Sequence, residues 1–266
     1  QYLFSSHSFI YILDSLGQNA GNYPIRLPAE ASTGLTLLPA EGGQPARYYI
    51  PCTSLRLFAY ELTGKPLAGF STMKLPGIIV RPVWIEPESG DLILLDAKGT
   101  AFVAGKTGDR KFTFRKTVQL REGTSFFRLA GGDAFINYVG ADGQLYSVNN
   151  DGEVNVSASE GFGDTTVFHA FGDLNGDQTD DHLSAGSEGL RAVTMDGVNI
   201  FRFRQDITFS QTGYHFLRGK SYVSAIGDGK MYLLNHDGTL LEGFPLTGQS
   251  IPVTGVNDDG GVLLFL

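Results

Sequence analysis

The sequence predicts an all-β fold, a β-propeller built of four-stranded antiparallel blades. Three observations lead to this prediction. One sequence unit recurs at a nearly constant spacing, short β-prone runs alternate with turn residues throughout, and no stretch has a helical period of hydrophobic residues. Glycine accounts for 35 of the 266 residues. Its usual share is about 7%, so this surplus indicates many tight turns.

The recurring unit is a short β-prone run, then a polar stretch, then a glycine. These glycines are Gly17, Gly64, Gly108, Gly152, Gly197 and Gly238, spaced by 47, 44, 44, 45 and 41 residues. An aromatic residue stands six positions before five of them, and Arg191 takes that place in the fifth repeat. Pro24 and Pro245 each follow a repeat glycine by seven positions. We expect a hairpin turn at each glycine and a strand after it.

Each unit holds about four β-prone runs, as a propeller blade does. We expect strands over 79–86, 91–96, 100–106 and 111–120, and in the next unit over 124–130, 133–139, 144–150 and 153–159. The chain length divided by the spacing gives about six blades. Seven stays open because both chain ends carry partial units. We expect these ends to share one closing blade, although one strand is then in excess.

Residues 1–266 are expected to form a single propeller domain. The chain starts and stops inside strands, so we expect it to be part of a longer protein. The net charge is −8 with no basic cluster, which argues against nucleic-acid binding. Cys52 is the only cysteine, so an internal disulfide is excluded and we expect a buried apolar residue there. No apolar run approaches the roughly 20 residues of a membrane span.

Three stretches, residues 10–38, 55–70 and 231–249, resemble a known family. It is the quinoprotein-like or BamB-like propeller domain of uncharacterised exported proteins from Gram-negative bacteria. The resemblance covers nearly the whole chain, and its motifs mark the blade more than a role. It implies a propeller and a location in the cell envelope, either periplasmic or surface-exposed.

A second, local resemblance lies in residues 171–190, which are similar to the calcium loop of FG-GAP or VCBS repeats. That pattern, D-x-D/N-x-D-G-x-x-D, implies Ca²⁺ ligands from the side chains of Asp173, Asn175, Asp177 and Asp181 and the carbonyl of Thr179. Alternating hard oxygens suit Ca²⁺, which takes six to eight of them. Gln178 replaces the usual glycine. The alternative is an ion-free, Asp/Asn-rich hairpin loop.

The histidines and carboxylates do not form a catalytic set in the sequence. No two of the five histidines have the spacing of metal partners. His169 and His215 lie in corresponding first-strand regions, so they could approach the channel of a propeller. Adjacent pairs such as Asp180–Asp181 and Asp258–Asp259 point to different sides if extended, unlike the facing acids of a glycosidase.

Other candidates are equally open to a structural explanation. Glu86 and Glu88 follow Trp84 and could present two acids and an aromatic ring at a channel mouth, or they could belong to a solvated turn. The quinoprotein resemblance suggests a quinone-dependent dehydrogenase. Alcohol dehydrogenases of that type use a vicinal cysteine pair and tryptophan docking motifs, whereas this chain has one cysteine and one tryptophan.

We therefore expect a non-catalytic propeller module that binds or scaffolds proteins in the bacterial envelope, with a protein as its partner. The first alternative is a calcium-stabilised carbohydrate- or adhesin-type binding module, suggested by the 173–181 loop. The second is a glycan-active or quinone-dependent enzyme, which would need histidine, acid and tyrosine side chains converging at one mouth. Apart from Ca²⁺, we expect no cofactor.

Overall fold

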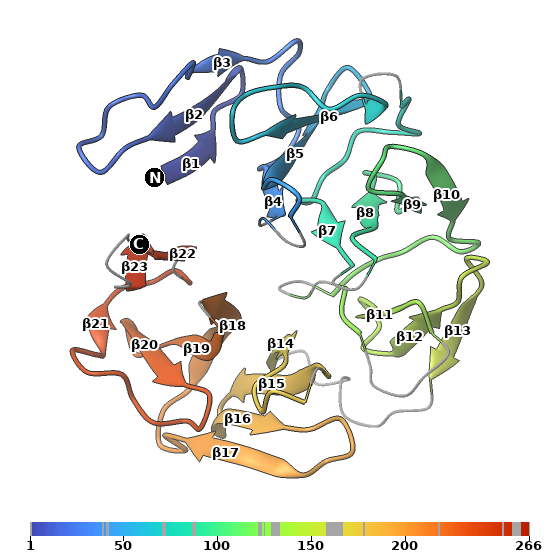
Figure 1. The fold of residues 1–266 in the computed structure, drawn as a ribbon. Helices are drawn as coiled ribbons and strands as arrows, with labels where there is room; N and C mark the ends of the chain where they lie inside the picture. The colour runs from blue at the N-terminus through green and yellow to red at the C-terminus, as the bar shows by residue number, and fades with distance from the viewer. Residues whose placement is uncertain are drawn as a thin grey trace. The chain divides into compact units, whose positions relative to one another are not determined.

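The computed structural model describes residues 2–38, 40, 43–70, 73–86, 89–121, 124, 126–128, 134–157, 167–177, 179–217, 219–251, 253–256 and 262–265. In the last two ranges only the backbone is described. The regular elements of this part of the chain are strands (Figure 1). None of the described residues belongs to a helix long and apolar enough to cross a membrane.

The chain divides into two compact units, which are described separately. The first comprises Gln1–Gln119 and Asn150–Val154. Its three antiparallel sheets are β1 (Tyr2–Ser5), β2 (Phe9–Leu13) and β3 (Ile25–Arg26); β4 (Thr36–Leu38), β5 (Arg47–Cys52) and β6 (Arg56–Glu61); and β7 (Trp84–Ile85), β8 (Leu92–Leu95), β9 (Ala101–Ala104) and β10 (Arg110–Thr113).

The second unit comprises Leu120–Asn149 and Asn155–Leu266. Its sheets are β11 (Ile136–Val139), β12 (Leu145–Val148) and β13 (Val154–Ser157, of which Val154 is counted in the first unit); β14 (Phe168–Gly172), β15 (Asp181–Gly186), β16 (Gly189–Val193) and β17 (Asn199–Phe203); β18 (Phe209–Leu217), β19 (Lys220–Gly227), β20 (Lys230–Asn235) and β21 (Leu246–Thr247); and the pair β22 (Val253–Val256) and β23 (Val262–Phe265). Consecutive strands pair with one another in every sheet. This order confirms the all-β fold and the blade-like units.

Several strands are shorter than the sequence indicated. Of the run 79–86, only Trp84–Ile85 forms a strand, and Ile79 makes an isolated bridge to Asp96. Pro82 lies between these two pairings and has no N–H to donate. The run 111–120 leaves its sheet after Thr113. The N–H of Arg115 then donates to the carbonyl of Gly152 at 2.7 Å, which directs this segment to the turn of the next repeat.

The six repeat glycines all have positive φ, between +75° and +89°. This confirms that they are turn residues, because L side chains rarely adopt such φ values. Four of the turns also press against the preceding repeat. A Cβ at Gly238 would lie 2.6 Å from the ring of Phe201, and one at Gly108 would lie 3.0 Å from the carbonyl carbon of Gly69. A side chain is therefore excluded there for lack of space as well.

The proline that follows the repeat glycine in two of the repeats also has a structural counterpart. Pro24 and Pro245, seven positions after their repeat glycines, both follow a cis peptide bond. The first and sixth repeats thus share a backbone feature as well as a sequence feature.

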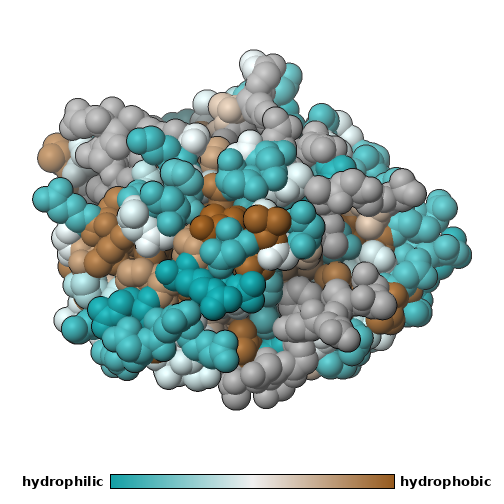
Figure 2. Space-filling model, turned by 90° about the horizontal axis from the view of Figure 1, so that it is seen from below, coloured by the Kyte–Doolittle hydropathy of each residue, from teal (hydrophilic) through white to brown (hydrophobic). Residues whose placement is uncertain are grey.

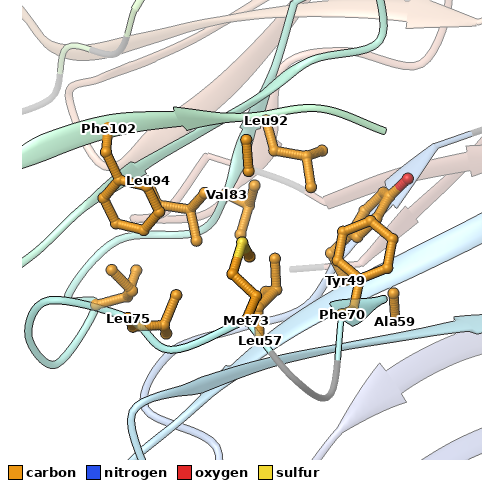
Figure 3. Close-up of a cluster of buried hydrophobic side chains, with 12 residues drawn as sticks. Tyr49, Leu57, Ala59, Phe70, Met73, Leu75, Val83, Leu92, Leu94 and Phe102 are labelled. Carbon is orange, nitrogen blue, oxygen red and sulfur yellow. The ribbon is translucent and has the colours of Figure 1, made fainter. Parts of the chain in front are cut away.

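Neighbouring sheets within each unit pack through apolar faces. In the first unit, strands β5, β6, β8 and β9 contribute to one cluster, drawn in Figure 3: Tyr49, Leu57, Ala59, Phe70, Met73, Leu75, Ile79, Val83, Leu92, Leu94, Phe102 and Ala104. The second unit has a comparable cluster between the β14–β17 and β18–β21 sheets, with Leu183, Ala192 and Phe201 opposite Val223 and Tyr232. Burial of this apolar area is the main force that holds adjacent sheets together.

Candidate functional site

The acidic loop of residues 173–181 connects β14 to β15. Its side chains mostly accept hydrogen bonds from its own backbone. The N–H of Gly176 donates to Oδ1 of Asp173 at 2.7 Å, and the N–H of Asp177 donates to Oδ1 of Asn175 at 2.9 Å. Both the N–H and the hydroxyl of Thr179 donate to Oδ1 of Asp177. These short-range bonds are typical of Asx turns and shape the loop.

Asp181 closes the loop and is fully buried. Its Oδ2 accepts the N–H groups of Leu174 and Asn175, at 2.8 and 3.3 Å. Its Oδ1 is also buried, and no donor among the described residues reaches it. Burial raises the pKa of Asp181, and the negative charges of Asp177 and Asp173 raise it further. A buried carboxylate oxygen without a donor favours either a proton or a cation.

The loop is fixed to the neighbouring sheet through its first residue. The carbonyl oxygen of Asp173 accepts the hydroxyl of Tyr214, from β18, at 3.0 Å and the hydroxyl of Ser221, from β19, at 2.6 Å. Next to Asp181, Oδ2 of Asp180 accepts the N–H of Arg128 at 2.8 Å. Burial raises the pKa of Asp180 as well. The two adjacent acids thus have different partners, as expected for side chains that point to different sides.

The oxygen atoms of this loop are of the chemical types that Ca²⁺ binds. Carboxylates, an amide oxygen and a backbone carbonyl are the hard ligands that Ca²⁺ takes, and the buried Oδ1 of Asp181 has no donor. In their present arrangement, however, the described residues contain no group of three or more His, Cys, Asp or Glu side chains that could hold a metal ion. Gln178, which replaces the usual glycine, lies outside the described residues.

Two histidines of the same sheet lie together, which the sequence spacing did not indicate. Nδ1 of His169, in β14, lies 2.8 Å from Nε2 of His182, in β15. Burial, followed by the positive charge of Arg191, lowers the pKa of His182 to about 4. The ring of Phe171 stacks on His182 with a centroid distance of 5.3 Å. The pairing depends on the register of the hairpin, in which His169 is opposite Ser184 and His182 is two residues away.

His215 does lie in a first strand like His169, as expected, since β14 and β18 begin their sheets. Its Nε2 is 2.7 Å from Oγ of Ser224. Burial lowers the pKa of His215 to about 4. The imidazoles of His182 and His215 are therefore neutral at pH 7 and belong to partly buried contacts.

Two further candidates, Glu86 and Cys52, have structural roles. Glu86 is buried, with 2% of its surface exposed, and its Oε2 accepts the N–H of Ser89 at 2.6 Å, so the expected solvated turn is wrong at this residue. Glu88, Asp258 and Asp259 lie outside the described residues. Cys52 is buried as expected, and burial raises the pKa of its thiol to about 11. A thiol with so high a pKa is a poor nucleophile at neutral pH.

Comparison with known proteins identifies the fold. No protein-family model and no curated protein matches the chain. Among solved structures, BamB from Moraxella catarrhalis is 14% identical, with 96% of this chain and 88% of that one covered and a TM-score of 0.53. BBS1N, solved in complex with ARL6DN, is 13% identical, with 90% and 72% covered and a TM-score of 0.54. A protein of unknown function from Bacteroides caccae is 13% identical, with 92% of both chains covered and a TM-score of 0.52.

These identities establish a shared fold and nothing beyond it. The sheets of three or four antiparallel strands and the likeness to BamB agree, so the chain has a β-propeller fold. A role for this chain has to be argued from its own residues.

Proposed function

We propose that this propeller is a non-catalytic module that binds a protein partner. It forms one domain of a longer protein in the bacterial cell envelope. The resemblance of residues 10–38, 55–70 and 231–249 to exported propeller proteins supports the location and the domain organisation. BBS1N, which has a similar fold, was solved bound to the protein ARL6DN, so this architecture can carry a protein-binding surface.

The observation that carries the proposal is an exposed aliphatic pair at a sheet edge. Ile78 and Val80 are 46% and 49% exposed, and they flank Ile79, which is fully buried. This short segment continues the edge of the β7–β10 sheet. The N–H of Val80 donates to the carbonyl of Leu95, and the carbonyl of Ile78 accepts the N–H of Ala97. Exposed apolar side chains beside an open strand edge are typical of protein-binding surfaces.

The test is capture of a partner from an envelope extract of the organism that makes the protein. The folded propeller serves as bait, bound proteins are cross-linked, and the heat-unfolded chain is the control. We expect at least one protein to be enriched on the folded bait alone. If the two baits enrich the same proteins, the capture is nonspecific and the proposal fails.

We further propose that Ca²⁺ binds the 173–181 loop and stiffens its blade. The ligands would be the side chains of Asp173, Asn175, Asp177 and Asp181 and the carbonyl of Thr179. The support is the buried Oδ1 of Asp181, which no described donor reaches. A bound cation would replace the missing donor and offset the repulsion among the three carboxylates. The second candidate function is a calcium-stabilised carbohydrate-binding module, which Ca²⁺ binding to this loop would support.

The Asp181→Asn variant tests whether the loop binds Ca²⁺ or is free of ions. In EDTA we expect this variant to melt at a higher temperature than the wild type, because it removes a charge that burial and two neighbouring acids disfavour. In millimolar Ca²⁺ we expect the order to reverse, since a ligand at 100 times its Kd stabilises the wild type by about 2.7 kcal/mol.

Asp173→Ala and Asp177→Ala are expected to remove the calcium-dependent rise in melting temperature. Thermal unfolding of all four proteins in both buffers provides the measurement. A wild type that melts identically in EDTA and in millimolar Ca²⁺ would show that the loop holds no ion.

A further inference from the structure

Arg191 is the one departure from the aromatic position of the repeat. The five equivalent residues are Tyr11, Phe58, Phe102, Tyr146 and Tyr232. The structure shows what an aromatic ring does there. Tyr232, in the next sheet, is 3% exposed and packs edge-on against Phe203 and Phe209, with centroid distances of 5.7 and 5.4 Å. Arg191 puts an exposed guanidinium where other repeats put a packed ring.

Arg191 belongs to a row of polar side chains that crosses the β14–β17 sheet. His169 pairs with Ser184, Ser184 with Arg191, and Arg191 with Arg202 in successive strands. Residues directly opposite in antiparallel strands lie on the same face. The next row, which includes Leu183 and Phe201, faces the apolar core on the other side. One row of this sheet is therefore polar and ends in two adjacent cations.

The two guanidinium groups have no counter-ion in the described part of the chain. Arg191 and Arg202 are both exposed, and none of the ion pairs found there includes either of them. By contrast Arg204, two residues along the same segment, binds Asp206 through two hydrogen bonds of 2.9 Å. Like charges directly opposite one another destabilise a sheet. The pair is also conspicuous on a protein of net charge −8.

A cavity of about 270 Å³ lies over this row, lined among others by Ser184, Glu188, Arg191, Arg202 and Gln205. It is entirely within the second unit. Its size is near the lower end of ligand sites, which begin at roughly 300 Å³. The face of the protein drawn in Figure 2 has strongly hydrophilic residues next to hydrophobic ones near its middle.

We propose that this cavity binds the oxyanion group of a small ligand, a carboxylate or a phosphate, between Arg191 and Arg202. Each guanidinium offers a planar fork of donors that matches two oxygens of such a group. Ser184 and Gln205 add neutral hydrogen-bonding groups for the rest of the ligand. The negative charge of Glu188 offsets part of the positive charge of the two guanidinium groups. We therefore expect a ligand with no more than one or two negative charges. This inference is independent of the proposed protein-binding role and of the calcium loop.

Arginine-resolved NMR tests the proposal directly. The ¹⁵N-labelled protein is titrated with inorganic phosphate and, separately, with succinate, while sodium chloride keeps the ionic strength constant. We expect saturable shifts of the Nε–Hε signals of Arg191 and Arg202, which are assigned by their loss in Arg191→Gln and Arg202→Gln. Saturation by phosphate alone would identify a phosphate-bearing ligand, and saturation by succinate alone would identify a carboxylate.

Single substitutions test whether each side chain strengthens or weakens anion binding. Arg191→Gln and Arg202→Gln should each weaken binding about tenfold, since charge-assisted bonds are the strong ones. Glu188→Gln should strengthen it about threefold, because an exposed opposing charge is lost. Arg204→Gln is the matched control and should leave the Kd unchanged.

Arg191→Tyr restores the aromatic residue of the repeat and should also weaken binding about tenfold, without lowering the melting temperature, so loss of the site is distinguished from loss of the fold. Nε–Hε signals that fail to saturate with either anion, or backbone N–H signals around the cavity that shift as much in the Arg191→Gln/Arg202→Gln double variant as in the wild type, would overturn the proposal.

Discussion

Gly152→Ala is expected to lower the free energy of unfolding by about 3 kcal/mol. Two effects add at this position. Gly152 has φ of +77°, which an L side chain adopts at a cost. A Cβ there would also overlap the Thr113 carbonyl oxygen, in the strand of the preceding repeat, because the two atoms would be much closer than the sum of their van der Waals radii. Backbone cannot yield as a flexible side chain can, and the same turn accepts the N–H of Arg115.

Gly17→Ala is the matched control for this substitution. Gly17 is the equivalent glycine of the first repeat and has φ of +75°, but a Cβ there would meet nothing within 4 Å. We expect it to cost about 1 kcal/mol, from the backbone conformation alone. Urea denaturation of both variants measures the difference. Equal losses would mean that contact between repeats does not constrain the turn.

Acidification is expected to destabilise the protein through two partly buried histidines, His182 and His215. The pKa of His182 is about 4 in the folded chain, against an ordinary value of 6.5. The unfolded chain therefore binds a proton between these two pH values while the folded chain does not. The stabilisation is complete above pH 6.5 and is lost as the pH falls toward 4. At pH 5 His182 alone lowers the free energy of unfolding by about 2 kcal/mol relative to its value at neutral pH.

His182→Gln tests this pH dependence, because glutamine keeps a hydrogen-bonding group beside His169 but does not titrate. The free energy of unfolding is measured at pH 7 and at pH 5 for both proteins. We expect the variant to lose about 2 kcal/mol less than the wild type over this interval. If both lose the same amount, the folded imidazole is protonated as easily as the unfolded one. His215, whose pKa is also about 4, acts in the same direction.

Much of the fold could be predicted because the repeat contains its own physical constraints. A glycine at a near-constant spacing needs a positive φ, and all six such residues have one. In the four-stranded sheets the position six residues earlier falls in the third strand, as Phe102 in β9 and Tyr232 in β20 show. The short β-prone runs between these turns then give an all-β fold. Strand ends were less predictable, since contacts between repeats decide where a strand such as β10 leaves its sheet.

The candidate sites depend on register, which a single sequence does not reveal. His169 and His182 meet because the β14–β15 hairpin sets them two residues apart across its strands. Arg191 and Arg202 become neighbours only through the pairing of β16 with β17. Arg191 was visible in the sequence as an exception to the aromatic pattern, but its significance depended on the adjacent arginine.

The proposed protein-binding role is tested most directly by one quantitative capture experiment with three folded baits. These are the wild type, the Ile78→Glu/Val80→Glu double variant and Val198→Glu. Val198 is 59% exposed and lies in the turn before β17, so it controls for a new charge on an exposed aliphatic residue. We expect wild type and Val198→Glu to enrich the same envelope protein, and the double variant to lose at least about nine-tenths of it. Equal recovery on all three baits would contradict the binding surface, and no protein enriched over the heat-unfolded chain would contradict the role itself.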